Sequence, residues 1–419
     1  MAKIDHRQLK RDYFWNTAAS IVNSAASVVL PIVVARVLGA AVGGVYSLAF
    51  SVAQQFQVVG QFEMRTFQST DLKEKYPFGV YYSSRILTCA AMLVCMSVYA
   101  CTTSQQFAVV ALMILVSGMR VLDAIEDVIQ GMLQQHGRLD IAGKAMFFRV
   151  LTTVIVFSAV VILTRNLIVA CLLAIGISAV VLYFLNYIPA RKYVTVRPIF
   201  DMKSVGSLLY SCLPLFVGQF LLMFLVNEPR FAIQSFLSDE YQLFYTAIFL
   251  PSLVINLLSG FVFRPLLTSL ASTWTEGDTR GFLTIVGRGL VAVLASTVLC
   301  AVLVWFAGVP VLSFLYGVDL SDFHVELTVL LLGGLFNALS VIAYLALVTM
   351  RGQRMIIIGY AIAACVSFLI ATPLVSSMQL MGAALTYVFS MFAVCAIFFL
   401  ALSWSLRLHR RLDKRGTES

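Results

Sequence analysis

Apolar runs of about 20 residues recur along this chain, roughly every 30–35 positions. At 1.5 Å per residue, a helix of that length crosses the ~30 Å hydrocarbon layer of a bilayer. Hydrophobic residues make up 60% of the 419 positions and charged residues only 12%, about half the charged share of a soluble domain. No polar stretch exceeds roughly 20 residues, which leaves no room for a separate soluble domain. The sequence therefore predicts an all-α polytopic membrane protein.

About twelve spans are expected. We place them at roughly residues 13–38, 43–64, 80–101, 106–134, 139–163, 167–188, 205–232, 240–268, 281–308, 324–350, 354–376 and 380–406. Lys and Arg concentrate in cytoplasmic segments of membrane proteins. With the N terminus inside, 24 of the 29 basic residues fall in inner segments. Both termini are thus expected in the cytoplasm.

The net charge of +9 lies at the ends of apolar runs, which argues against nucleic acid as a partner. The eight cysteines all lie within apolar segments, with no CxxC spacing and no nearby His, so we interpret them as small buried hydrophobes rather than metal ligands. No cleavable signal peptide is visible before the first span. No P-loop motif is present either, which argues against direct use of ATP.

A basic connection at 189–204 divides the predicted spans into six and six. The expected domains are an N-terminal lobe (1–188), this linker, a C-terminal lobe (205–406) and a basic cytoplasmic tail (407–419). At an offset of 199 positions, Tyr46 aligns with Tyr245 and Phe50 with Phe249. Both halves begin inside, so the repeat would be parallel, with a cleft expected between two six-helix lobes.

Short motifs connect the sequence to a known group of transporters. Residues 34–39 (Val-Ala-Arg-Val-Leu-Gly) and 44–49 (Gly-Val-Tyr-Ser-Leu-Ala) resemble the opening of bacterial polysaccharide-type flippases. These belong to the multidrug/oligosaccharidyl-lipid/polysaccharide (MOP) exporter superfamily. Residues 129–134, 263–266 and 381–384 are similar to later segments of the same family, so the resemblance covers the whole chain. It implies a flippase that moves polyprenyl-diphosphate-linked oligosaccharides from the inner to the outer leaflet of a bacterial cell membrane.

The sequence also departs from related branches. Lipid II flippases of the superfamily usually carry two further spans, and the multidrug branch often has an acidic residue in span 1. Span 1 here carries neutral polar residues instead: Asn16, Thr17, Ser20, Asn23, Ser24 and Ser27. A multidrug or cation antiporter remains the alternative to a flippase. An enzyme would need a larger outer loop than the roughly 15 residues available at 309–323, and a non-transporting scaffold would need neither paired lobes nor buried charges.

Charged groups at membrane depth cost about 2.5–3.5 kcal/mol each on insertion scales, so each calls for a reason. Span 4 carries Arg120, Asp123, Glu126 and Asp127, and span 5 carries Arg149 at comparable depth. One interpretation is a polar cavity in which arginines contact substrate and a carboxylate titrates or binds Na⁺. The other is a neutral cluster in which Arg120 pairs with Asp123, and Arg149 with Glu126 or Asp127.

Proline interrupts the lead helix of each half. Pro31 and Pro229 align within two positions at the 199 offset. They could serve as hinges for alternating access, since proline frees a carbonyl and bends a helix. Glu228 and Arg230 flank the second proline. In this interpretation Glu228 is a coupling carboxylate and Arg230 contacts the substrate. Alternatively they pair with each other beside an ordinary kink.

Arg65 and Arg264 occupy equivalent positions at the predicted inner ends of spans 2 and 8. Arginine offers planar, permanently charged donors that suit a diphosphate, so the two form a candidate substrate clamp. They can equally be anchors to lipid headgroups. Arg36, at the outer end of span 1, is either a cavity contact or a structural residue at a helix end.

No cofactor is expected beyond possible coupling to Na⁺ or H⁺. The expected partners are the lipid-linked glycan, membrane lipids, and possibly a polymerase or glycosyltransferases of the same pathway.

Overall fold

The computed structural model describes residues 6–71, 75–350 and 352–416, without the side chains of 6, 9, 70, 258, 260–268 and 408–416. Within these ranges the chain forms helices and no strand, which confirms the all-α prediction. Three basic residues counted for orientation, Lys3, Lys73 and Arg351, lie outside the described residues. The side chains of Arg264 and of the tail beyond Arg407 do so as well.

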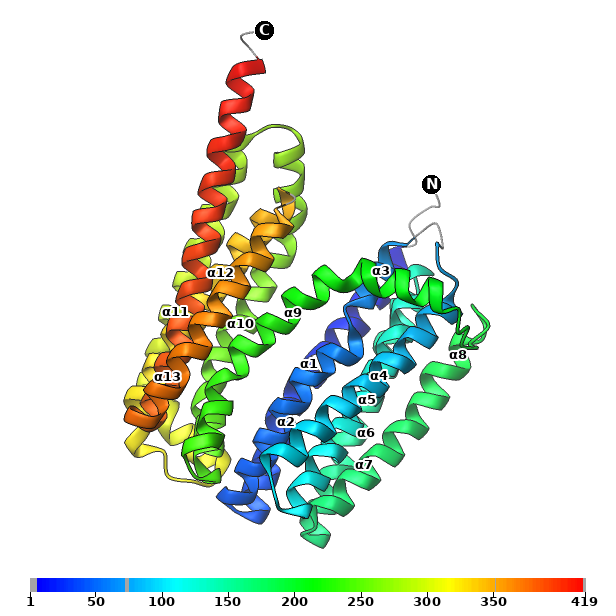
Figure 1. Cartoon of the computed structure of the whole chain (residues 1–419), viewed down its shortest axis with the longest axis vertical. Coiled ribbons are helices and arrows are strands. Elements are labelled where there is room, and N and C mark those ends of the chain that lie inside the picture. Colours follow the sequence, from blue (N-terminus) through cyan, green and yellow to red (C-terminus); the bar gives the residue numbers. More distant parts are fainter. Residues whose placement is uncertain (1–5, 72–74, 351, 417–419) are drawn as a thin grey trace. The chain divides into compact units, whose positions relative to one another are not determined.

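The chain divides into two compact units, residues 1–223 and 224–419. The first unit holds α1 (His6–Leu38), α2 (Ala40–Gln61), α3 (Met64–Thr70), α4 (Phe78–Thr103), α5 (Phe107–Gln135), α6 (Leu139–Thr164), α7 (Leu167–Leu182), the π-helix η1 (Tyr183–Tyr187) and α8 (Ile188–Ala190). The boundary falls inside α9 (Met202–Phe236), whose first part belongs to the first unit. Neighbouring helices α4, α5, α6 and α7 run side by side (Figure 1).

The second unit continues with the rest of α9. It contains α10 (Asp239–Thr275), α11 (Thr279–Tyr316), the short 3₁₀ helix η2 (Ser321–Phe323), α12 (His324–Thr349) and α13 (Gln353–Gly416). Two predicted spans, 354–376 and 380–406, are joined in α13 across a kink at Gln379, whose φ of 51° and ψ of −125° are not helical.

Nine helices within the described ranges are long and apolar enough to cross a membrane, which makes this a multi-pass membrane protein. One of the nine is α13, which covers two predicted spans. The helix α2 is not among them, because glutamines at 54, 55, 57 and 61 lower its hydropathy. For α10, part of the apolar stretch falls on residues whose side chains are not described.

Helices α1 and α6 approach each other at backbone distance around Gly143. A Cβ at this position would lie 2.6 Å from the carbonyl carbon of Trp15 and 2.7 Å from the amide nitrogen of Asn16. Small residues allow this kind of approach between membrane helices, where van der Waals packing replaces the hydrophobic effect. At the start of α6, the amide of Asp140 donates to the carboxylate of Asp12 at 2.7 Å, which fixes the register of the pair.

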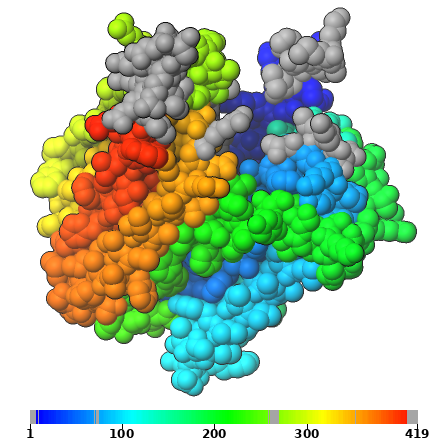
Figure 2. All heavy atoms as spheres, turned by 45° about the horizontal axis from the view of Figure 1, so that its top comes forward, coloured from blue at the N-terminus to red at the C-terminus, as the bar shows by residue number. Residues whose placement is uncertain are grey.

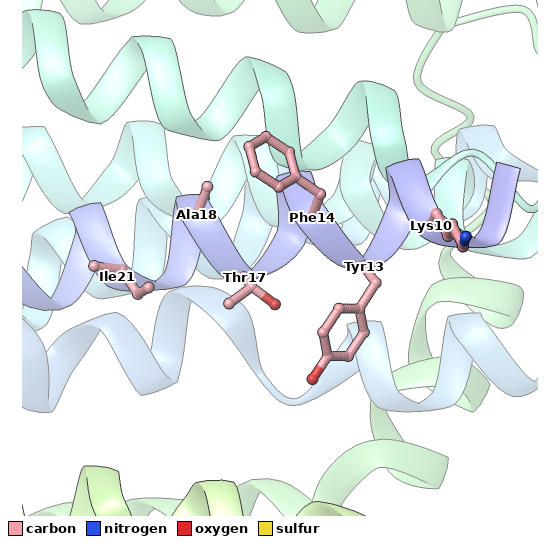
Figure 3. Close-up of a pocket in the computed structure, with 6 residues that line it drawn as sticks. All are labelled: Lys10, Tyr13, Phe14, Thr17, Ala18 and Ile21. Atoms are coloured by element: carbon pink, nitrogen blue, oxygen red, sulfur yellow. The ribbon is translucent and has the colours of Figure 1, made fainter. Parts of the chain in front are cut away.

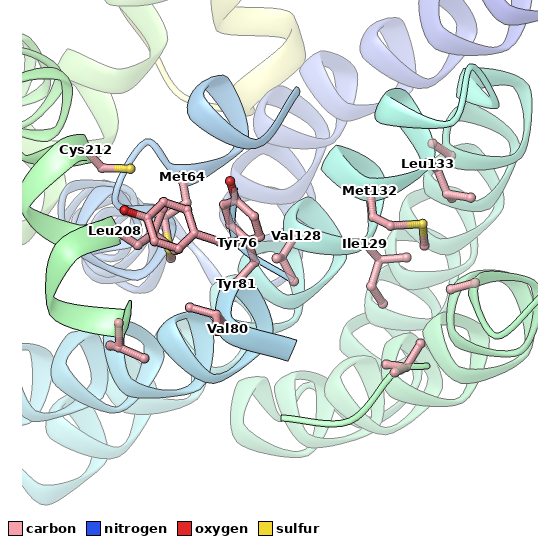
Figure 4. Packing of buried hydrophobic residues seen from close by; sticks show 14 residues of the cluster. Met64, Tyr76, Val80, Tyr81, Val128, Ile129, Met132, Leu133, Leu208 and Cys212 are labelled. Carbon is pink, nitrogen blue, oxygen red and sulfur yellow. The ribbon is translucent and has the colours of Figure 1, made fainter. Parts of the chain in front are cut away.

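A buried cluster closes one end of the first unit. Its members come from α3, α4, α5, α6 and the start of α9, with one from the connection before α4 and two from the 189–204 region: Met64, Tyr76, Val80, Tyr81, Val128, Ile129, Met132, Leu133, Ala142, Ala190, Val196, Val205, Leu208 and Cys212 (Figure 4). The hydroxyls of Tyr76 and Ser207 share a hydrogen bond of 2.8 Å. These contacts explain why the first part of α9 belongs with the helices that precede it.

Replacing Gly143 tests the close approach of α1 and α6. We expect Gly143→Val to destabilise the first unit by about 1–3 kcal/mol, because the new side chain must push against backbone atoms. The measurement is thermal unfolding of the purified protein in detergent. Gly176→Ala is the matched control, since a Cβ at Gly176 in α7 meets nothing within 4 Å. Equal melting of the two variants would contradict the packing.

Candidate functional site

A guanidinium at membrane depth joins two helices of the first unit. Arg149 lies about 15 Å along α6 from its start and is only 4% exposed. Its Nη2 donates to Asp123 at 2.6 Å and to Glu126 at 2.7 Å, and its Nε donates to Glu126 at 2.9 Å. Its third nitrogen, Nη1, donates to the hydroxyl of Ser178 in α7 at 2.9 Å. The donors of Arg149 are therefore directed at α5 and α7, and with Arg120 on Asp123 two guanidiniums balance the two carboxylates.

The π-helix η1 supplies a further partner to this group. Within it, Asn186 is fully buried and its Nδ2 donates to the second oxygen of Glu126 at 2.7 Å. Single π-turns inside membrane helices shift the side-chain register by one position and are frequent at functional sites. Asn186 Oδ1 has no hydrogen-bond partner among the described atoms. Glu126 is thus held by charge on one oxygen and by an amide on the other.

A second ion-pair group lies nearer the end of α5. Arg85 in α4 is fully buried, and it donates to the carbonyl of Gly60 at 2.7 Å and to Asp127 at 2.8 Å. Arg65 reaches the other oxygen of Asp127 at 3.5 Å only. Its closer partner is the neutral side chain of Gln130 at 2.6 Å, and Gln134 follows at 3.3 Å. Asp127 therefore belongs mainly to Arg85, and the charge of Arg65 is not cancelled at close range.

Arg65 is aimed by a break in the chain. Phe62 and Glu63 are both left-handed, with φ of 48° and 51°, so that α2 ends and the short helix α3 begins. Side chains other than glycine rarely adopt this conformation, and such strain is often kept at functional sites. The helix α3 then packs on Gly131 of α5, where a Cβ would meet the side chain of Gln68 and lie 3.4 Å from Cγ of Arg65. The side chain of Arg65 remains 31% exposed.

The ion pairs of this region leave an excess of positive charge. Four arginines (65, 85, 120 and 149) pair with three carboxylates (123, 126 and 127), a balance of plus one. Glu63 lies close enough to interact with Asp127 and Arg85, but it makes none of these ion pairs. Its carboxylate instead accepts a hydrogen bond from the hydroxyl of Thr66 at 3.0 Å. The excess is greatest around Arg65 and Arg85.

Arg120 is held by an aromatic ring as well as by charge. Its guanidinium lies 4.2 Å from the ring centroid of Phe50, and one nitrogen donates to Asp123 at 2.8 Å. Stacking on a ring positions the guanidinium plane and leaves its edge donors for other ligands.

The second unit repeats the aromatic part of this arrangement. Tyr245 and Phe249 of α10 correspond to Tyr46 and Phe50 of α2, and both tyrosines are fully buried. Arg230 lies over this pair, 5.6 Å from the ring of Tyr245 and 5.3 Å from that of Phe249. It comes from α9, whereas Arg120 comes from α5. In each unit an arginine thus lies over the phenylalanine of this pair, but the arginine comes from a different helix.

The predicted pairings are partly wrong. Arg120 pairs with Asp123 and Arg149 with Glu126, as expected for the neutral cluster, and Arg149 has Asp123 as a further partner. Glu228 and Arg230 do not pair, because side chains two positions apart point to opposite sides of a helix. Glu228 is 7% exposed, and its side chain has no hydrogen bond or ion pair among the described residues.

The remaining predicted residues lie apart from this group. Pro31 and Pro229 lie inside α1 and α9, which continue past them. Arg36 is exposed in the last turn of α1, where a cation favours the negative end of the helix dipole. Arg264 belongs to α10, and its side chain is outside the described residues.

An apolar cavity of about 500 Å³ runs along one face of α1. The residues that line it are spaced three and four apart: Lys10, Tyr13, Phe14, Thr17, Ala18 and Ile21 (Figure 3). A single ammonium group therefore stands at one end of an otherwise apolar wall.

Sequence reasoning missed two residues of the site. Arg85 was counted with the basic inner loops, although it lies inside a predicted span, at a depth where a charge needs partners. Asn186 stands alone as a polar residue in an apolar stretch, a signal that could have marked it. Among the described residues, no group of three or more His, Cys, Asp or Glu side chains is placed to hold a metal ion.

The sequence matches no protein-family profile and no curated protein. Solved structures do match. The lipid II flippase MurJ, in an inward closed conformation, aligns with a TM-score of 0.71 at 14% identity, over 92% of this chain and 87% of that one. An inward-facing multidrug resistance MATE family transporter of the MOP superfamily aligns with a TM-score of 0.69 at 12% identity, over 93% and 95%. A MOP superfamily transporter from Pyrococcus furiosus aligns with a TM-score of 0.59 at 14% identity, over 97% and 96%.

This chain therefore has the fold of a MOP superfamily transporter, which confirms at the level of the fold the resemblance found in the sequence. These neighbours are transporters and flippases, not enzymes.

Removing the central guanidinium tests whether it holds the first unit together. We expect Arg149→Met to cost about 3–5 kcal/mol, because Asp123 and Glu126 are left buried with less compensating charge. Thermal unfolding in detergent measures the loss. Adding Glu126→Gln should recover part of it, since one uncompensated charge is removed. A single variant as stable as the original protein would show that the network is dispensable.

Proposed function

We propose that this protein is a flippase that moves a polyprenyl-diphosphate-linked oligosaccharide from the inner to the outer leaflet by alternating access. The observation that carries the proposal is the exposure of Arg65 and the nature of its partners. It is partly exposed and bound mainly by neutral glutamines, and it stands beside a buried arginine that takes the nearby carboxylate. A diphosphate carries about two negative charges and accepts bidentate hydrogen bonds, so it suits a site with spare guanidinium donors.

In this proposal the chain crosses a bacterial cell membrane twelve times, with both termini in the cytoplasm. Arg65 then lies at the inner end of α2, where a substrate made in the cytoplasm arrives. Arg264 would supply the equivalent donor from the second unit. The cavity along α1 offers an apolar wall for the isoprenoid chain, with Lys10 at its inner end. A polymerase or glycosyltransferases of the same pathway are the expected partners.

Charge supplies part of the driving force. An interior-negative potential favours outward movement of two negative charges by roughly 4–5 kcal/mol per 100 mV, if they travel without compensating cations. An ion gradient is then needed mainly to reset the carrier. In the first unit, Asp123, Glu126 and Asp127 are each bound by arginine, so a coupling ion would have to displace a guanidinium. Glu228 is the better candidate for coupling, because it is buried without such a partner among the described residues.

Flipping in proteoliposomes tests the proposal. The substrate is a fluorescent polyprenyl-diphosphate oligosaccharide, and its exposure at the outer leaflet is read by a membrane-impermeant quencher. Arg65→Gln should slow flipping roughly tenfold, the cost of one charge-assisted hydrogen bond, and Arg264→Gln should add to the loss. Arg288→Gln, which removes an exposed charge from α11, is the matched control. Glu63→Gln should not slow flipping, because it removes a negative charge near the arginines. Unchanged flipping with both arginines replaced would overturn the assignment.

Glu228 also favours the alternative, a multidrug or cation antiporter, since a buried carboxylate can exchange a proton for a cationic drug. Replacing Glu228 distinguishes the two functions. An antiporter predicts gradient-driven efflux of a cationic dye that Glu228→Gln abolishes. We expect no such efflux from the original protein, and we expect Glu228→Gln to slow repeated flipping only when an Na⁺ or H⁺ gradient is imposed.

A further inference from the structure

One stretch of the first unit, between α8 and the first turn of α9, exposes apolar and basic side chains together. It runs from Arg191 to Lys203, and we call it the 191–203 surface. Ile199, Phe200 and Met202 are 46%, 51% and 61% exposed. Four basic side chains that accompany them are exposed as well: Arg191, Lys192, Arg197 and Lys203. Figure 2 shows this part of the chain, in green, at the molecular surface.

The exposed apolar side chains are held in place by the backbone. The amide of Ile199 donates to the carbonyl of Gly79 at 2.9 Å, and the carbonyl of Ile199 accepts from the hydroxyl of Ser83 at 2.6 Å. A Cβ at Gly79 would come within 2.7 Å of the carbonyl oxygen of Arg197, so the segment lies directly on α4. The phenol of Tyr187 adds a longer bond to the carbonyl of Val196. A segment fixed at this many points cannot turn its apolar side chains inward.

The charges of this surface are nearly all of one sign. Its single acidic residue, Asp201, is used locally, because its carboxylate accepts from the hydroxyl of Ser204 at 2.6 Å and from the amide of Lys203 at 3.2 Å. The Ser204 hydrogen bond lowers the pKa of the Asp201 carboxyl, which remains a solvated charge at the start of α9. The four basic side chains are therefore exposed, and none of them forms an ion pair with another described residue.

Aromatic side chains extend the surface toward the membrane. Tyr183 and Phe184 at the start of η1 are 48% and 58% exposed. Amphipathic aromatic rings accumulate where a span meets the headgroup layer. Apolar side chains beside a cluster of Lys and Arg are the signature of segments that lie in an anionic membrane interface.

We propose that the 191–203 surface is a docking site for anionic phospholipids, with Arg191, Lys192 and Arg197 on the headgroups and Phe200 and Met202 in the acyl boundary. Charge complementarity selects this occupant over a neutral lipid. With the orientation proposed above, the lipids belong to the cytoplasmic leaflet. Its side chains make none of the hydrogen bonds of Arg65 described above, and lipid binding there can be measured without transport.

Lipid retention tests the site. The full-length protein is placed in nanodiscs of phosphatidylcholine with an equal part of phosphatidylglycerol, then extracted into mild detergent, and the lipids that remain bound are counted by native mass spectrometry. We expect preferential retention of phosphatidylglycerol, which weakens with salt. In the triple variant Arg191→Gln, Lys192→Gln and Arg197→Gln, the preference should fall about fivefold for each charge removed.

Two controls keep the result specific. Arg280→Gln, Arg288→Gln and Arg354→Gln remove three exposed charges elsewhere and should leave the preference intact. Phe200→Ser with Met202→Ser should lower the retention of both lipids without changing their ratio. Thermal unfolding confirms that each variant is folded. No preference in the original protein, or equal losses in the two triple variants, would overturn the proposal and point to a protein as the occupant of this surface.

Discussion

The buried guanidinium of Arg149 is the interaction on which the first unit depends. It ties α6 to the two carboxylates of α5 and to Ser178 of α7, while Asn186 completes the shell around Glu126. In a bilayer no water is available to solvate these charges, so each stabilises the others only while the helices stay in register. The network thereby fixes α5, the helix that carries Asp127 and the glutamines of Arg65. The position of the functional Arg65 therefore depends on the structural Arg149.

The charges of α5 thus divide into two roles along its length. Those in the middle, Asp123 and Glu126, are consumed by packing and match the neutral cluster considered from the sequence. Toward its end, Asp127 holds Arg85 tightly, and the neutral side chains of Gln130 and Gln134 bind Arg65. A transporter that accepts an anion needs such an arrangement, because a guanidinium that is fully neutralised has nothing to offer a substrate. For the same reason, Arg65 lies closer to the amides of Gln130 and Gln134 than to the carboxylate of Asp127.

The sequence predicts the helical class and the depth of the buried charges well, because hydropathy and the cost of charge in a membrane act locally. It fails where pairing depends on rotation and register. Glu228 and Arg230 are close in sequence, but two positions along a helix place their side chains on opposite sides. Arg85 and Asn186 escaped notice for related reasons, since one was absorbed into an inner basic loop and the other depends on a π-turn that no residue pattern announces. The left-handed pair at Phe62 and Glu63, which aims Arg65, has no glycine to mark it.

Binding of a short-chain prenyl diphosphate to the purified protein tests the central claim most directly, because it isolates recognition from transport. Isothermal titration would compare the diphosphate with the matching monophosphate and alcohol, in the original protein and in Arg65→Gln. The account predicts tightest binding for the diphosphate, weakening with salt, and a loss in the variant that removes most of its advantage over the alcohol. Equal affinity for all three compounds, or an undiminished preference for the diphosphate in Arg65→Gln, would contradict it.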